Sequence, residues 1–335
     1  MHKIILMTNQ MNAQMVFFET IKKNVSSNFR LADIVGDVLG VSQDSAYRRI
    51  RGEKVLTMNE MATLCRYFHL SMDAVINNQS DNVTFKHTSL DISNMNNYYL
   101  YMEQLATLME NIAKAKEKDI YFMAVDIPMP HFTPFLELTL FKIYTWFHSV
   151  NKLNITYEQF VAQLDVPLLK AIYDRITNAY NCIPSIEIWT NNTIDPILNL
   201  LAYYPDLHCI EMKETFPLIC SQLLQLIENI EKCAEREKKE YKGRDVSFRM
   251  YLSPLAIMND FMITKRDGIN VTTIKLYTIN GIITSDDNFC SEVERWMQNS
   301  ISTSLSLSGH SSRERFQFFH KLKNGMNYLL ETKKN

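Results

Sequence analysis

A glycine between two short amphipathic segments constrains the fold of this chain most strongly. Before it, four apolar residues fall on one face of a helix: Leu31, Ala32, Val35 and Leu39. Gly40 follows, where a left-handed backbone can end that helix. Ser42 can cap a second helix over 43–51, which places Ala46 and Ile50 on one face. Two helices joined by so tight a turn predict a helix-turn-helix, in which the first helix braces the second.

Four short motifs follow one another along this region. They are Leu31-Ala32, Leu39-Gly40-Val41-Ser42, Arg51-Gly52 and Leu70-Ser71-Met72-Asp73. In order and spacing they resemble the LA, LGVS, RG and GVSLD motifs of lambda-repressor-like (Cro/XRE-type) helix-turn-helix regulators. The phrase DSAYRRIRGE is similar to a subset of one-component bacterial regulators. The resemblance spans about residues 14–77 and implies an all-α domain that reads operator DNA.

The sequence departs from the family's motifs at three places. His69 replaces the usual glycine after the fourth helix, and histidine tolerates the left-handed conformation better than most residues. Asn28 stands where many members carry glutamine. At positions 49 and 50 the family usually has an apolar residue followed by an acidic one, whereas this chain has Arg49 and Ile50. The direction in which Arg49 points is therefore left open.

The resemblance implies that the second helix enters the major groove of DNA. There Gln43 would pair with adenine, Arg48 with guanine, and Tyr47 would contact a thymine methyl or a phosphate. Tyr47 has the alternative of packing on the fourth helix. The start of the first helix, near Asn28 and Arg30, would face a phosphate through free N–H groups. The full set expected to contact DNA is Asn28, Arg30, Gln43, Asp44, Ser45, Tyr47, Arg48, Arg51 and Lys54.

Charge supports DNA binding only weakly and favours a homodimer. The net charge of the 335 residues is −2. Residues 1–76 carry nine Lys or Arg and seven Asp or Glu, and the remainder carries 26 and 30. A monomer with so small a positive excess has few phosphate contacts to offer. A dimer doubles them and would place its half-sites about 34 Å apart on DNA.

Pattern and composition predict three segments: a DNA-binding domain over 1–77, a linker over 78–94, and a domain over 95–335. The fold class we expect is mainly α with a smaller antiparallel β part, an all-α helix-turn-helix domain preceding an α+β domain. Helices are expected at about 135–150, 156–164 and 167–181, from 195, from Thr215 to Gly243, and twice at the end of the chain. Strands are expected at 120–126, 246–252, 261–266, 271–279 and 282–284, with hairpin turns at Asp267-Gly268 and Asn280-Gly281.

Two features of the larger domain can each be interpreted in two ways. An apolar seam from Met95 to Ile112 either packs on its own domain or dimerises. A set of aromatic residues either fills the core or lines a pocket: Phe132, Phe135, Tyr144, Trp146, Phe147, Trp189, Tyr203 and Tyr204.

Nothing in the sequence indicates catalysis. We find no GxGxxG, Walker, GxSxG or HExxH motif, and glycine is scarce. Glu187 and Asp195 are isolated carboxylates, and we assign His131 to a structural role. The six cysteines form no CxxC pair, so we expect reduced thiols, no metal and no cofactor. Without a signal peptide or a membrane span, we expect a cytoplasmic protein.

Three functions remain open. The leading hypothesis is a one-component transcription regulator that binds double-stranded DNA, with a C-terminal domain that dimerises and can sense a small-molecule effector. The second is a protein-interaction or antitoxin-like module that uses the same fold without operator binding. The third is an enzyme with an appended DNA-binding domain, which would require a polar, convergent pocket around residues 120–210.

Overall fold

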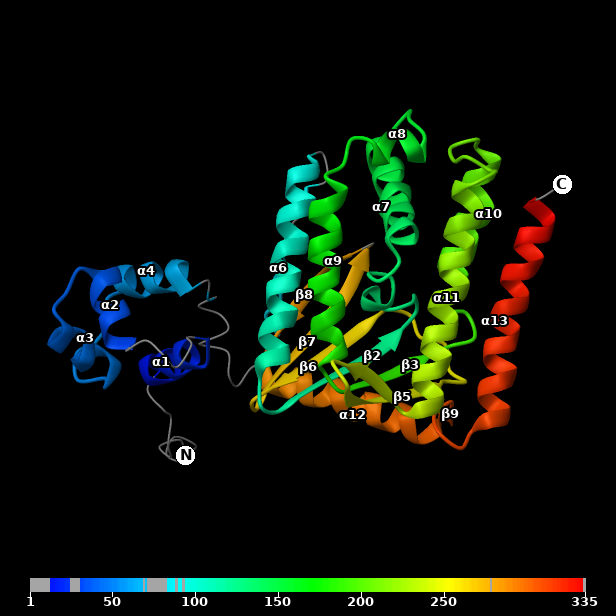
Figure 1. Cartoon of the computed structure of the whole chain (residues 1–335). Helices are drawn as coiled ribbons and strands as arrows, with labels where there is room; N and C mark the ends of the chain where they lie inside the picture. Colours follow the sequence, from blue (N-terminus) through cyan, green and yellow to red (C-terminus); the bar gives the residue numbers. More distant parts are fainter. Residues whose placement is uncertain are drawn as a thin grey trace, which may run out of the picture. The chain divides into compact units, whose positions relative to one another are not determined.

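The computed structural model describes residues 13–24, 31–68, 70, 83–87, 90–91, 94–277 and 279–333. The chain divides into two compact units, Met1–Thr84 and Phe85–Asn335 (Figure 1). Residues of the predicted linker do not all lie between the units, because Lys86 and His87 form a short strand of the second unit.

Four helices make up the described part of the N-terminal unit: α1 (Ala13–Asn24), α2 (Leu31–Leu39), α3 (Gln43–Ile50) and α4 (Met58–Phe68). Their apolar faces meet in one core, which contains Phe17, Phe18, Ile21, Ala32, Val35, Ala46, Leu56, Leu64 and Cys65. Because no single one of these short helices can bury its apolar face alone, the unit depends on their mutual packing.

A tight turn joins α2 to α3, where the sequence predicts it. Gly40 has a φ of +64°, and the Val41 N–H donates to the Gly36 carbonyl at 3.0 Å. A Cβ at Gly36 would lie 3.1 Å from the Val41 carbonyl oxygen, so the close approach of the turn favours glycine there as well. Ser42 caps α3, and its hydroxyl accepts from the Ser45 N–H. The prediction of two helices around Gly40 is confirmed.

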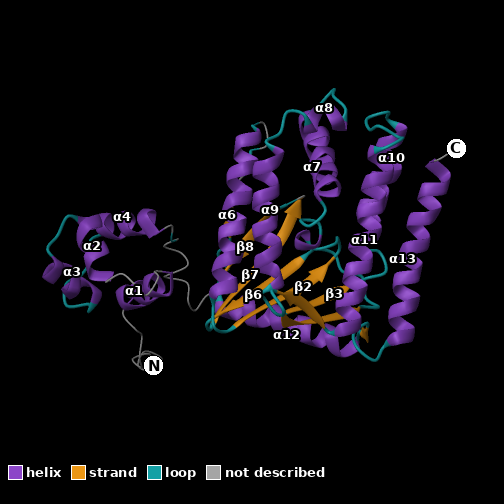
Figure 2. Ribbon diagram, in the orientation of Figure 1, coloured by secondary structure: helices purple, strands orange, loops and turns teal. Residues whose placement is uncertain are grey.

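The C-terminal unit is a mixed sheet with helices on both faces (Figure 2). Its helices are α6 (Met95–Lys114), η1 (Met129–His131), α7 (Leu136–Asn151), α8 (Tyr157–Val161), α9 (Val166–Asn181), α10 (Asp195–Asp206), α11 (Thr215–Arg236), α12 (Asp287–Thr303) and α13 (Ser312–Lys333). Its strands are β1 (Lys86–His87), β2 (Lys118–Ala124), β3 (Ser185–Trp189), β4 (Lys238–Tyr241), β5 (Arg244–Leu252), β6 (Phe261–Arg266), β7 (Ile269–Tyr277), β8 (Asn280–Thr284) and β9 (Leu305–Ser306).

The strand order is β1-β8-β7-β6-β2-β3-β5-β4, with β9 paired to β5. β3 pairs in parallel with both β2 and β5, and the other pairs are antiparallel. The expected antiparallel arrangement is found for β6, β7 and β8, but it does not hold for β3, so the sheet is mixed. Parallel neighbours need long crossovers, and here α7 to α9 connect β2 to β3 while α10 and α11 connect β3 to β5.

The alternation of side chains along β2 sorts them between the two faces of the sheet. Ile120 and Phe122 pack with residues of α6 and α9. Met123 packs instead with Val293 and Met297 of α12, on the opposite face. The same alternation places Ser185, Glu187 and Trp189 of β3 on one face together.

Three local predictions fail, each for a physical reason. The helix expected to run to Gly243 ends at Arg236, because Glu237 is left-handed and β4 instead pairs with β5 around a turn at Lys242-Gly243. The turn expected at Asn280-Gly281 is displaced, because both residues lie in β8, Gly281 opposite Lys275. A Cβ on Gly281 would stand 2.9 Å from the Ile274 carbonyl oxygen, so this glycine provides space between strands. The third failure is β3, which was not predicted.

The elements predicted elsewhere in this unit are found close to their expected positions. The two-residue turn at Asp267-Gly268 is confirmed, with positive φ at both residues. The α6 seam is buried within its own unit, with Tyr98 and Met102 fully enclosed, so it is not available for dimerisation. Seven of the eight singled-out aromatics belong to the core, whereas Tyr203 is 58% exposed.

No described helix combines the length and apolar character that a membrane crossing needs.

Candidate functional site

The surface of α3 carries most of the residues predicted to contact DNA. Gln43, Asp44, Tyr47 and Arg48 are exposed there, and Arg51 and Lys54 are exposed directly after the helix. Tyr47 keeps 40% of its surface exposed, which does not favour the alternative of packing on α4. Asn28 and Arg30 lie outside the described residues.

Three of these side chains, Gln43, Arg48 and Arg51, already have partners within the unit. The Gln43 amide donates to the Asp33 carboxylate of α2. Glu53 lies beside two arginines, with its carboxylate 3.1 Å from Arg51 Nε and 3.8 Å from Arg48 Nε. All three of the latter side chains are about half exposed. Such pairs contribute about 0–1 kcal/mol and exchange easily for another anion.

Arg49 lies on the buried side of α3, which answers the question that the sequence leaves open. Its guanidinium donates to Glu60 Oε1 at 2.6 Å and to the Ser45 hydroxyl at 2.5 Å. The hydrogen bond from Arg49 lowers the pKa of Glu60 below its ordinary value of 4.5. Glu60 also accepts from the Thr57 N–H at the start of α4. Arg49 therefore links α3 to α4, and the hydroxyl of Ser45 is turned to that link rather than to solvent.

Gln14 of α1 holds the segment that follows α3. Its amide nitrogen donates to the carbonyls of Arg49 and Lys54, at 2.7 and 2.8 Å, and its oxygen accepts from the Leu56 N–H at 2.9 Å. Gln14 is 5% exposed. These bonds fix the backbone that carries Arg51 and Lys54.

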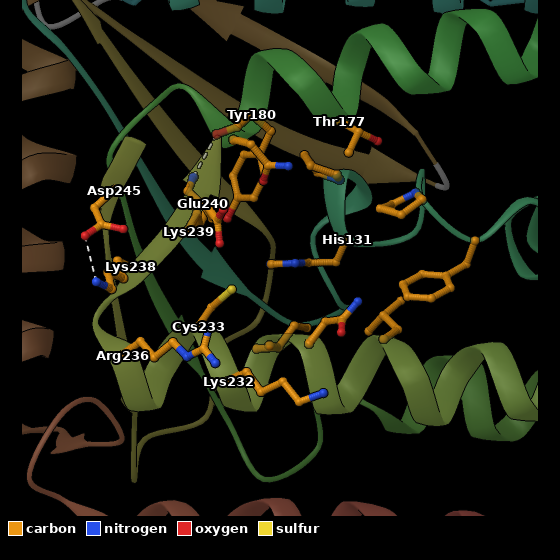
Figure 3. Close-up of a pocket in the computed structure, with 17 residues that line it drawn as sticks. His131, Thr177, Tyr180, Lys232, Cys233, Arg236, Lys238, Lys239, Glu240 and Asp245 are labelled. Atoms are coloured by element: carbon orange, nitrogen blue, oxygen red, sulfur yellow. Dashed lines mark hydrogen bonds and ion pairs between the residues drawn. The ribbon is translucent and has the colours of Figure 1, made fainter. Parts of the chain in front are cut away.

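A second site lies in the C-terminal unit, where a cavity of about 360 Å³ opens between α9, η1, α11 and β4. Figure 3 shows His131, Tyr180 and Cys233 entering it from three of these elements, η1, α9 and α11. The volume is within the range of pockets that hold small molecules. Its lining includes the residues His131, Thr177, Tyr180 and Asn181, so polar groups from 120–210 do converge here.

Beneath the cavity, Glu187 of β3 gathers three donors. It is fully buried and accepts from His131 Nε2 at 2.7 Å, the Tyr180 hydroxyl at 2.5 Å and Trp189 Nε1 at 2.8 Å. Burial alone would raise the pKa of Glu187, but the His131 ring and the other two donors hold it below the ordinary value. Because an ionised carboxylate only accepts, His131 Nε2 carries the proton in this pair.

Lys239 closes one side of the cavity from β4. Its amine donates to the carbonyls of Tyr180 and Ile183 and to the Ser185 hydroxyl, at 2.6 to 2.9 Å. Burial lowers the pKa of Lys239 to about 7, so near neutral pH this amine carries only part of a positive charge. Burial also raises the pKa of Cys233, so its thiol stays protonated and is a poor nucleophile.

Sequence reasoning identified the α3 surface and missed the cavity. His131 and Glu187 stand 56 residues apart, and neither belongs to a spaced motif. One signal was available: Ser185-Ile-Glu-Ile-Trp189 alternates as a strand does, which puts a carboxylate on the same face as two buried residues. Within the described residues, no three His, Cys, Asp or Glu side chains gather closely enough to hold a metal ion.

Comparison of the chain with protein-family models, with curated proteins and with solved structures gives no match.

Proposed function

We propose that this protein is a sequence-specific DNA-binding regulator, in which α3 reads operator DNA. The observation that supports the proposal is the division of α3 into two faces. Gln43, Asp44, Tyr47 and Arg48 face solvent, while Ala46 and Arg49 face the unit's own core. Among the described residues of the N-terminal unit, the polar contacts of these exposed side chains are at the surface, between Gln43 and Asp33 and between Arg48 and Glu53.

The geometry of the exposed face suits the major groove. Gln43 and Tyr47 are four residues apart, as are Asp44 and Arg48, so each pair lies along one side of the helix. An α-helix fits the groove, and its first turns meet the base edges. There the Gln43 amide can pair with adenine, the Asp44 carboxylate can accept from cytosine, and Arg48 can pair with guanine. Arg51 and Lys54 follow the helix and supply phosphate contacts.

The three partnered side chains exchange their contacts on binding. Gln43 leaves Asp33, and Arg48 and Arg51 leave Glu53. Because these contacts are exposed, the exchange costs little, and the bases and phosphates offer stronger bidentate partners. Arg49 keeps its buried contact with Glu60 and acts as a structural residue.

The C-terminal unit is proposed to dimerise the protein and to sense a small-molecule effector. Dimerisation follows from the small positive charge of residues 1–76, since two copies double the phosphate contacts. The dimer surface is not the α6 seam, which is buried.

Selection of genomic fragments by the full-length protein, followed by footprinting, tests the proposal. We expect enriched fragments to share two half-sites about one helical turn apart, ~34 Å. The proposal fails if low-salt selection yields no fragment bound better than shuffled DNA of the same composition.

One observation favours the second candidate, an interaction module. Val55 and Met58, which follow the α3 segment, are 76% and 71% exposed, and both are apolar. A protein partner that covers them would compete with DNA for the same surface. If selection yields no DNA, capture of a defined partner that is lost in Val55→Asp would establish this alternative.

A further inference from the structure

The cavity between α9, η1, α11 and β4 has a positively charged mouth. Lys232 and Arg236 stand four residues apart on the last turns of α11, and both side chains are exposed. Neither makes an ion pair or side-chain hydrogen bond with any residue that the structure describes. On the other side of the cavity, Lys238 differs from them, because it pairs with Asp245 at 2.6 Å. Figure 3 shows Lys232 and Arg236 along the α11 side of the space.

The carboxylates of the lining do not neutralise this mouth. Asp245 is engaged by Lys238. Glu240 is the other carboxylate, and it is exposed on β4, beside the buried Lys239. At the mouth, two exposed cations therefore outnumber the one exposed carboxylate, Glu240. The ionised Glu187 lies beneath the floor, where three donors and the partly charged Lys239 offset it, so the field at the mouth favours an anion.

The lining of the cavity offers both apolar surface and polar side chains, among them His131. Pro130, Pro134, Phe135, Leu226 and Ile230 contribute the apolar part of the lining. His131 binds Glu187 through Nε2, and its Nδ1 has no hydrogen-bond partner among the described residues. Glu187, itself held by Tyr180 and Trp189, fixes the orientation of the His131 ring.

We propose that this cavity binds a small organic anion, with a carboxylate or phosphate group carried on a compact apolar body. The anionic group contacts Lys232 and Arg236, the apolar body lies against Phe135 and Ile230, and His131 Nδ1 bonds a polar atom of the ligand. About 360 Å³ accommodates a ligand of that size. The assignment concerns the C-terminal unit alone and holds whether or not α3 binds DNA.

Ligand-detected NMR titration of the full-length protein, without DNA, tests the assignment. The probes are phenyl phosphate and benzoate. Benzyl alcohol is the uncharged analogue, and inorganic phosphate is the anion that lacks an apolar group. We expect millimolar binding of at least one aromatic anion, tighter than that of benzyl alcohol and of inorganic phosphate. The stronger of the two aromatic anions identifies the charged group. The assignment is overturned if neither aromatic anion binds, or if benzyl alcohol binds equally well.

Variants at the mouth place the binding in this cavity. The double variant Lys232→Ala/Arg236→Ala should weaken binding about tenfold or more, because it removes two charge-assisted contacts. Glu240→Gln should tighten it, and Asn229→Trp, at an exposed lining position, should block it. The matched control is Arg295→Ala/Lys321→Ala, which removes two exposed cations from α12 and α13. Equal weakening by the control, or unchanged binding in the mouth variant, would show that the anion binds elsewhere.

Discussion

His131 Nε2 lies 2.7 Å from Glu187 Oε1, and this contact joins η1, the short helix after β2, to strand β3 within the sheet. The carboxylate is fully buried and has two further donors, Tyr180 and Trp189. Replacing a buried acceptor that satisfies three donors costs free energy, because each donor that loses its partner stays buried. Such a donor has neither a protein acceptor nor the water to which it would bond in the unfolded chain.

Glu187→Gln should therefore destabilise the C-terminal unit by about 1–3 kcal/mol, although the side chains are nearly the same size. The amide nitrogen of glutamine is itself a donor, so it cannot accept a hydrogen bond from the groups that donate to the Glu187 carboxylate. Urea unfolding followed by tryptophan fluorescence measures the effect, with Glu240→Gln on the exposed surface as the control. A loss no greater than that of the control would show that the three bonds contribute little to the free energy of unfolding.

The pairing of Glu187 with His131 illustrates what the sequence could not predict. The Ser42 cap, the Gly40 turn and the Asp267-Gly268 hairpin depend on neighbouring residues, and these three were predicted correctly. β3 was missed because a charged residue sits at an inward position, and donors from elements distant in the sequence, His131 of η1 and Tyr180 of α9, make that position acceptable. The sequence pattern predicts helix over β4, because its lysines and glutamate suit a solvated helix. Its strand conformation is determined by pairing with β5, which the local pattern does not show.

For the α3 site as well, local sequence pattern predicts some features, and contacts with other helices determine the rest. Periodicity along α3 correctly placed Gln43, Tyr47 and Arg48 on exposed faces. It could not place Arg49, because the partner that makes its burial tolerable, Glu60, belongs to another helix. Local pattern predicts which residues of α3 are exposed, whereas a tertiary ion pair decides which arginine is buried.

The Arg49–Glu60 pair should make the N-terminal unit sensitive to acid. The pKa of Glu60 is lower in the folded protein than its ordinary value of 4.5, so the unfolded chain takes up the proton first as pH falls. The stabilisation is fully present above pH 4.5 and is lost as pH falls through the folded pKa. Glu60→Gln cannot titrate, so its thermal midpoint should lie below that of wild type near neutral pH.

The gap between the two thermal midpoints should narrow as the pH is lowered below 4.5. Circular dichroism melts over a pH series measure it, and Glu19→Gln on α1 is the exposed control. A gap that stays constant at every pH would mean that the ionisation of Glu60 does not contribute to stability.

Glu53 should restrain DNA binding. Its carboxylate pairs with Arg51 and lies near Arg48, so it competes with phosphates for both. Glu53→Gln removes that competition and one negative charge near the DNA, and we expect affinity to rise a few-fold, about 1 kcal/mol or less. Fluorescence anisotropy on a selected fragment measures the change against Glu19→Gln. Weaker binding by Glu53→Gln would indicate instead that Glu53 orients the arginines for the bases.

The most direct test of the account compares Arg48→Ala with wild type in anisotropy titrations. A selected fragment and its shuffled counterpart are titrated at several salt concentrations, with Arg66→Ala on α4 as the control for loss of one exposed arginine. The account predicts that Arg48→Ala loses about 1–3 kcal/mol of preference for the selected fragment, while log affinity still falls linearly with log salt. Arg66→Ala should keep the preference. If Arg48→Ala discriminates the two fragments as well as wild type does, α3 does not read the bases through Arg48, and the central claim is contradicted.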